Sequence, residues 1–173
     1  MDANGAFSPT DVNEKMLKFS EFHIHSIEQP IKQGQWEQMA SLCESTPIPI
    51  ALDEELIGIT DQNQIIAMLD SIQPQYIILK PSLVGGWSQS GAFIREAENR
   101  NIGWWITSAL EGNIGLNAIS QWTHTLGNKM PQGLGTGQLF TNNFESPLFI
   151  EDARLKYNPN NSWNLSDLID ETR

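Results

Sequence analysis

The chain has 173 residues, of which 39% are hydrophobic and 18% charged, so one domain with a sizeable buried core is expected. The 21 acidic residues outnumber the ten basic ones and give a net charge of −11, which disfavours nucleic-acid binding because phosphate backbones are repelled. A single cysteine, Cys43, excludes an internal disulfide, and no Cys/His spacing suggests zinc. No long apolar run predicts a membrane span and no signal-peptide pattern opens the chain, so the cytoplasm is the expected location.

Short apolar runs alternate along the chain with longer segments of helical periodicity. In chain order we expect a strand at 22–28, a helix at 35–44, a strand at 49–53, a helix at 65–72, a strand at 76–80, a helix at 91–100, a strand at 103–108, a helix at 114–126 and a glycine-rich strand end at 133–135. Such alternation predicts an α/β fold with a parallel sheet built from βαβ units.

The spacing of these expected strand ends is nearly constant. One residue marks each end, at steps of 25 to 28 residues: Asp2, Glu28, Asp53, Lys80, Ser108 and Gly133. This even step favours a (β/α) barrel of the TIM type, in which one strand, one helix and their loops take about 30 residues. A doubly wound sheet is the alternative, but the chain has no glycine-rich phosphate-binding motif.

The side chains at the first four of these positions suggest chemistry. In a βα barrel the carboxyl ends of the strands carry the active site, and here they read Asp2, Glu28, Asp53 and Lys80. Three carboxylates on neighbouring strands suit a hard divalent cation, Mg²⁺ or Mn²⁺, and a lysine on the next strand would meet the same centre. The competing explanation is that these acids merely cap the helices that follow.

Four motifs resemble the muconate-lactonizing branch of the enolase superfamily. Its third barrel strand ends in DxN, its fourth in EQP, its fifth in DE, and its sixth in a lysine followed by a glycine-containing loop. This chain has those motifs in that order, as 2-DAN-4, 28-EQP-30, 53-DE-54 and 80-KPSLVGG-86. The resemblance implies an incomplete TIM-type (β/α) barrel that runs from strand three to strand eight.

Two later segments are similar to the o-succinylbenzoate synthase family within that branch, namely 107-TSALEGNIGL-116 and 132-QGLGTG-137. The resemblance implies that Asp2, Glu28 and Asp53 bind Mg²⁺, with Mn²⁺ as the alternative metal. It places Lys80 against the face of a bound reaction intermediate. It also places Ser108 and Gly133 near the succinyl end of a small carboxylate substrate.

The reaction implied by the resemblance is the dehydration of a cyclohexadiene carboxylate to o-succinylbenzoate, a lyase step of menaquinone biosynthesis. Residues 1–150 would form the partial barrel, and residues 151–173 a tail that in the family returns to a capping domain. Racemisation of N-acylamino acids or epimerisation of dipeptides, by the same branch, is an alternative activity. A non-catalytic fragment is the alternative from a different functional class.

Measured against the family pattern, the chain begins at the third strand. The second-strand KxK motif, whose second lysine is the family's acid–base catalyst, and the capping domain have no counterpart in the sequence. The resemblance therefore predicts impaired catalysis by this chain alone. The open sheet edges predict marginal stability, self-association or pairing with a complementary N-terminal segment. A sharp monomeric unfolding transition that does not depend on concentration would contradict that expectation.

Two histidines and two adjacent tryptophans are interpreted as structural residues and not as parts of a site. His23 and His25 alternate with Ile24 on the expected strand and should face the helix layer, opposite Glu28. Of the adjacent Trp104 and Trp105, only one can face the barrel interior.

Overall fold

The computed structural model describes residues 1–166 and divides the chain into two compact units. The first unit runs from Met1 to Trp105, and the second begins at Ile106. The tail expected at 151–173 lies partly, at 167–173, outside the described residues.

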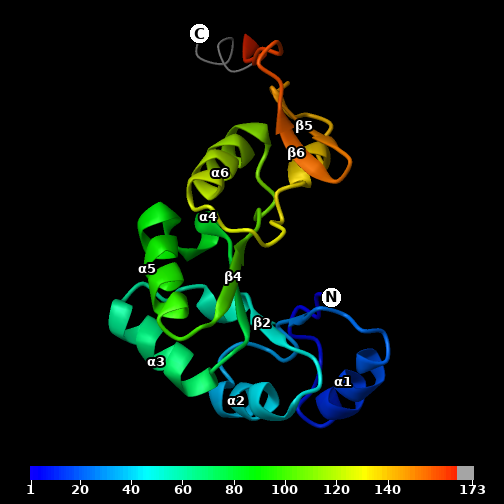
Figure 1. The fold of residues 1–173 in the computed structure, drawn as a ribbon, viewed down its shortest axis with the longest axis vertical. Helices are drawn as coiled ribbons and strands as arrows, with labels where there is room; N and C mark the ends of the chain where they lie inside the picture. The colour runs from blue at the N-terminus through cyan, green and yellow to red at the C-terminus, as the bar shows by residue number, and fades with distance from the viewer. Residues whose placement is uncertain (167–173) are drawn as a thin grey trace. The chain divides into compact units, whose positions relative to one another are not determined.

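The core of the first unit is a short-stranded sheet (Figure 1). Its strands lie in chain order: β1 (Ile27–Glu28), β2 (Ile50–Leu52), β3 (Tyr76–Leu79) and β4 (Gly103–Ile106). β1 pairs with β2 and β2 with β3 in parallel, and a parallel bridge joins Asp2 to Glu28 beyond β1. The strand–helix repeat expected from the spacing is therefore confirmed as an incomplete (β/α) barrel.

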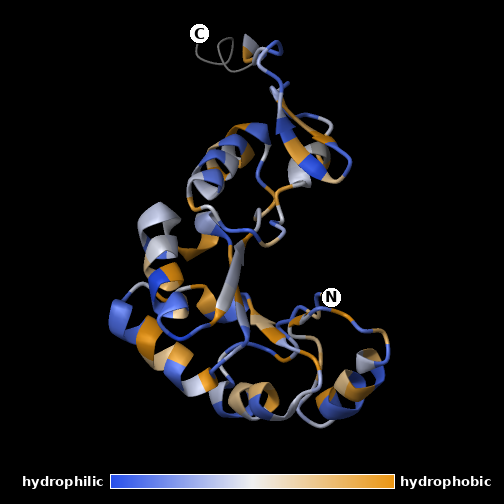
Figure 2. Ribbon diagram, in the orientation of Figure 1, coloured by the Kyte–Doolittle hydropathy of each residue, from blue (hydrophilic) through white to orange (hydrophobic). Residues whose placement is uncertain are grey.

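Helices connect the strands and cover one side of the sheet (Figure 1). The first unit contains α1 (Val12–Ser20), α2 (Trp36–Ser45), η1 (Glu54–Leu56), α3 (Gln62–Ile72), α4 (Pro81–Val84) and α5 (Gly86–Glu98). Asp61 caps α3 by accepting hydrogen bonds from the backbone N–H groups of Asn63 and Gln64. The alternation of hydrophobic and hydrophilic residues along these helices is visible in Figure 2.

The first expected strand was too long. The run 22–28 forms strand only at Ile27–Glu28, because His23 lies in the left-handed region with φ of 52° and the residues before Ile27 form a turn and a loop. The helix expected at 91–100 begins earlier, at Gly86. At Gly133 the structure has a single parallel bridge to Thr107 rather than a strand of several residues.

The second unit contains α6 (Asn113–Thr125), η2 (Thr136–Gln138) and a two-stranded antiparallel hairpin. The hairpin pairs β5 (Leu148–Glu151) with β6 (Arg154–Tyr157) in a register that opposes Leu148 to Tyr157 and Glu151 to Arg154. The hairpin spans the boundary expected at residue 150, and that boundary stays a prediction. None of the helices in residues 1–166 combines the length and the apolar character needed to cross a membrane.

Packing in the first unit depends on aliphatic strands and on a large aromatic residue from α5. Ile50, Leu52, Ile77 and Leu79 have no exposed surface, as is typical of parallel strands covered by helices. Phe93 is also fully buried and is the largest side chain among the most deeply buried residues.

Replacing Phe93 by alanine is expected to lower the free energy of unfolding by about 3–5 kcal/mol, because a cavity replaces a buried ring. Urea unfolding followed by circular dichroism measures this loss. The matched control is Phe22→Ala, since the Phe22 ring is 72% exposed and its removal should change stability little. Equal losses in the two variants would contradict the assignment of Phe93 to the core.

Candidate metal and acid–base site

Three neighbouring strands end at the same edge of the sheet, and each supplies one charged side chain there. Glu28 is the last residue of β1, Asp53 follows β2, and Lys80 follows β3. Asp2 joins this edge through its parallel bridge to Glu28, and the backbone N–H of Ala3 donates to the carbonyl of Glu28 over 3.0 Å. The structure therefore brings together the four residues that the spacing had placed at successive strand ends.

Lys80 is the cationic partner of this edge. Its ammonium group donates a hydrogen bond to Oδ2 of Asp53 and lies 3.8 Å from Oε1 of Glu28. Burial lowers the pKa of Lys80, but the hydrogen bond to Asp53 and the charges of Asp53 and Glu28 outweigh burial, so the pKa of the ammonium lies above its ordinary value. Lys80 is therefore held protonated beside the acidic side chains of Asp53 and Glu28.

The carboxylates themselves repel one another. Burial, the negative charge of Asp2, and the hydrogen bond and charge of Asp53 raise the pKa of Glu28 to about 8, against the opposing effect of Lys80. Asp53 is nearly inaccessible, with 2% of its surface exposed. Within residues 1–166, no group of three or more His, Cys, Asp or Glu side chains has the spacing of metal ligands as it stands.

The raised pKa of Glu28 predicts how the stability of the chain without added metal depends on pH. The folded state holds the carboxyl proton of Glu28 more tightly than the unfolded chain, in which the pKa of this carboxyl has its ordinary value of 4.5. The stabilisation is thus fully present below about pH 4.5 and is lost as the pH rises to about 8. Carboxylates with lowered pKa values, such as Glu96, contribute in the opposite sense at lower pH, so a decline between pH 5 and 8 reports the carboxyl groups with raised pKa values, Glu28 foremost.

Urea unfolding at pH 5 and pH 8 measures this decline. We expect Glu28→Gln to lose most of it, while the exposed Glu44→Gln on α2 keeps it. The remainder is expected from Glu54, where burial is the main cause of a raised pKa. A Glu28→Gln variant with an undiminished decline would contradict the prediction.

Sequence reasoning missed the polar residues that surround this edge. Gln29 is fully buried, and Glu55 is only 5% exposed. Oε2 of Glu54 is buried without a hydrogen-bond partner among the described residues. Gln29 and Glu54 lie within the EQP and DE motifs, but no sequence pattern gave them a role, and the hydrogen bonds of Gln29 to Asp53 and Glu55 join residues that are far apart in the chain.

Ser108 and Gly133 belong to the second unit. Ser108 is buried, donates to a carboxylate oxygen of Glu111, and accepts hydrogen bonds from the backbone of Leu110 and from the hydroxyl of Thr136, the latter over 2.6 Å. Gly133 bridges Thr107, and a Cβ at position 133 would collide with the Thr107 side chain. These contacts give both residues structural roles, and their assignment to substrate binding stays a prediction.

The histidine expectation was wrong for His25. Its ring contacts those of Tyr76, with centroids 4.8 Å apart, and Trp105, at 6.1 Å. Tyr76 alternates with Ile78 and Lys80, so His25 lies on the side of the sheet that carries the lysine. The strand alternation fails because the strand starts only at Ile27.

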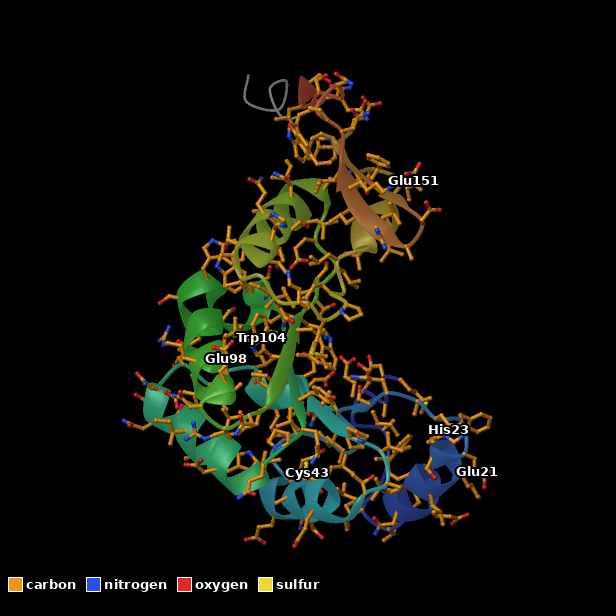
Figure 3. All side chains as sticks on the ribbon, viewed as in Figure 1. Glu21, His23, Cys43, Glu98, Trp104 and Glu151 are labelled. Atoms are coloured by element: carbon orange, nitrogen blue, oxygen red, sulfur yellow. The ribbon has the colours of Figure 1, made fainter. Side chains whose placement is uncertain are left out.

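The adjacent tryptophans separate as expected. The indole N–H of Trp104 donates to Oε1 of Glu98 at the end of α5, over 3.2 Å, and Figure 3 shows the two side chains near each other. Trp105 instead packs against Tyr76, with ring centroids 5.6 Å apart. Cys43, also labelled in Figure 3, is a buried free thiol in α2, and burial raises its pKa to about 12, in keeping with a core role.

Comparisons with known proteins place this arrangement in a family. An o-succinylbenzoate synthase from Desulfotalea psychrophila is 58% identical over 155 residues, which cover 90% of this chain and 42% of that protein. A crystal structure of MenC from the same organism superposes with a TM-score of 0.86 over 89% of this chain and 43% of that chain, also at 58% identity. The chain thus spans less than half the length of these relatives.

A muconate cycloisomerase from Pseudomonas fluorescens shares the fold, with a TM-score of 0.84 at 23% identity over 99% of this chain and 48% of that one. The profile of the family described as "Enolase C-terminal domain-like" matches residues 1–160. The chain therefore belongs to the enolase C-terminal domain-like family.

Proposed function

We propose that this chain supplies the metal-binding carboxylates and the sixth-strand lysine of an o-succinylbenzoate synthase-type dehydratase, a carbon–oxygen lyase that acts on a small carboxylate. One observation carries the proposal: a protonated Lys80 stands against Asp53 and near Glu28 where neighbouring parallel strands end. The 58% identity to a relative named o-succinylbenzoate synthase supports the substrate class and a place in menaquinone biosynthesis.

Asp2, Glu28 and Asp53 are the proposed ligands of Mg²⁺, with Mn²⁺ as the alternative. The donor set fits such an ion, since carboxylate oxygens are what hard divalent cations prefer. Burial and the repulsion from Asp2 and Asp53 raise the pKa of Glu28, and a divalent positive charge would relieve the repulsion. When bound, the ion would supply positive charge beside the substrate carboxylate.

Lys80 would then act on the substrate directly. In the proposed reaction the acid–base lysine of the family's second strand would take a proton from the carbon next to the carboxylate and return it to the β-hydroxyl, whose bond to the ring breaks so that water departs as the ring becomes aromatic. Negative charge develops on the carboxylate side of the substrate, and a protonated Lys80 stabilises it without first having to take up a proton. Its raised pKa keeps the ammonium charged throughout the physiological range.

The test measures by chromatography the Mg²⁺-dependent formation of o-succinylbenzoate from the cyclohexadiene substrate. We expect turnover that depends on Lys80, weak with the chain alone and stronger when a separately expressed N-terminal segment of a relative is added. The relatives' greater length supports the second arm. Racemisation of an N-acylamino acid by the same samples, with no o-succinylbenzoate formed, would replace the proposed activity with the alternative one.

A further inference from the structure

The side-chain amide of Gln29 is buried next to the proposed metal ligands Glu28 and Asp53. Gln29 follows Glu28, has no exposed surface, and its backbone is in the left-handed region with φ of 37°. A residue other than glycine adopts that conformation only at an energetic cost, so its surroundings must hold it there.

The side chain of Gln29 uses every hydrogen-bonding position it has. Its Oε1 accepts from the backbone N–H of Asp53 over 3.2 Å and from that of Glu55 over 3.3 Å. Its Nε2 donates to the carbonyl of Ile31 over 3.1 Å and to Oε2 of Glu55 over 3.2 Å. The opposite orientation of the amide would point Nε2 at two N–H donors, so the chemistry of the neighbours fixes the orientation.

Glu55, in the short helix η1 that follows β2, completes the network. Its Oε1 accepts from the backbone N–H of Gly34 over 2.8 Å and from the indole N–H of Trp36, the first residue of α2, over 2.7 Å. Three neutral donors therefore hold this buried carboxylate, including the one from Gln29. The network links the loop after β1 to the turn after β2.

We propose that Gln29 and Glu55 are positioning residues for the proposed metal site, so that their hydrogen bonds set the separation of the Glu28 and Asp53 carboxylates. The inference rests on the proposed function. Gln29 is bonded along the chain to Glu28 and through space to the backbone N–H of Asp53. A shift of the amide would thus move the two carboxylate-bearing segments relative to one another.

The test uses a reciprocal exchange in the full chain. Gln29→Glu places two carboxylates against each other, whereas Glu55→Gln places two amide donors against each other. The double variant Gln29→Glu/Glu55→Gln again pairs an acceptor at position 29 with a donor at position 55. It keeps the acceptors for Asp53, Gly34 and Trp36 and the net charge of the chain, and loses only the donor to the Ile31 carbonyl.

Calorimetric titration with Mg²⁺ is the readout, and Phe93→Leu is the control that weakens the core away from the network. We expect each single variant to bind Mg²⁺ about tenfold or more weakly, the double variant to recover to within about threefold of the unchanged chain, and the control to keep its affinity. Single variants that unfold more easily yet bind Mg²⁺ as tightly as the unchanged chain would overturn the positioning role.

Hydrogen exchange gives a readout that needs no metal. Exchange of the Asp53 and Glu55 amides should accelerate at least tenfold in Gln29→Leu, whereas the sheet amide of Ile27, which donates to the Pro49 carbonyl, should stay protected. Unchanged exchange at Asp53 and Glu55 would show that the Gln29 side chain does not hold these two amides, and would overturn the positioning role. Absence of Mg²⁺ binding by the unchanged chain would instead overturn the proposed function, and the positioning role with it, even if exchange behaves as expected.

Discussion

Replacing Lys80 by methionine is expected to reduce o-succinylbenzoate formation by about 10²–10⁴-fold, whether the chain acts alone or with an added N-terminal segment. The physical reason is the loss of the only ammonium that stands beside Asp53 and Glu28 among the ion pairs of residues 1–166. Methionine has a similar length and apolar stem, so the change removes the charge with little loss of packing. Turnover under saturating Mg²⁺ measures the effect.

The same variant makes a second, opposite prediction that separates catalysis from metal binding. In the structure the ammonium of Lys80 donates a hydrogen bond to the carboxylate of Asp53, so a metal ion must compete with the ammonium for that carboxylate. Lys80→Met should therefore bind Mg²⁺ at least as tightly as the unchanged chain. Lys15→Met is the control. Lys15 on α1 pairs with Asp11, the residue before that helix, and its replacement should change neither turnover nor Mg²⁺ binding. Loss of Mg²⁺ affinity together with turnover would show that Lys80 acts mainly by holding the site together.

The strand ends could be predicted because the repeat that places them is local. Each strand, helix and pair of loops takes a similar length of chain, so Glu28, Asp53 and Lys80 fall at the same edge whenever the units pack in parallel. Apolar runs around Ile50 and Ile77 are short, bounded and β-branched, which is enough to identify buried strands. The motifs then gave these positions a chemical meaning that spacing alone could not.

The residues that escaped prediction depend on tertiary contacts. The hydrogen bond from the Asp53 amide to Gln29 crosses 24 positions of the chain, and that from Gln29 to Glu55 crosses 26. No local pattern distinguishes such a buried glutamine from an exposed one. His25 was placed on the wrong side for a related reason, since the strand alternation was extended over residues that form a loop.

Replacing Asp53 by asparagine is expected to weaken Mg²⁺ binding by about 100-fold or more, which is larger than the effect expected from changing its supporting residues. Asparagine keeps the shape of the side chain and removes one negative charge from the proposed ligand set. Asp53 is also the most buried of the three carboxylates, so solvent cannot replace its contribution easily. Calorimetric titration measures the loss, and Asp70→Asn is the matched control, because Asp70 pairs with Arg100 on the helical layer.

The stability of Asp53→Asn in the absence of Mg²⁺ decides whether that loss comes from the missing ligand or from a disturbed fold. Removing the charge deprives Lys80 of its closest partner, which is destabilising, but it also relieves the repulsion that adds to burial in raising the pKa of Glu28. Because Glu28 lies 3.8 Å from the ammonium, it can take over part of the pairing. The two effects oppose each other, so the loss in the free energy of unfolding should stay below the roughly 3–5 kcal/mol that removing one partner of a buried ion pair costs by itself. A far larger loss of stability would mean that Asp53 serves the fold first, and that the weaker Mg²⁺ binding follows from local unfolding.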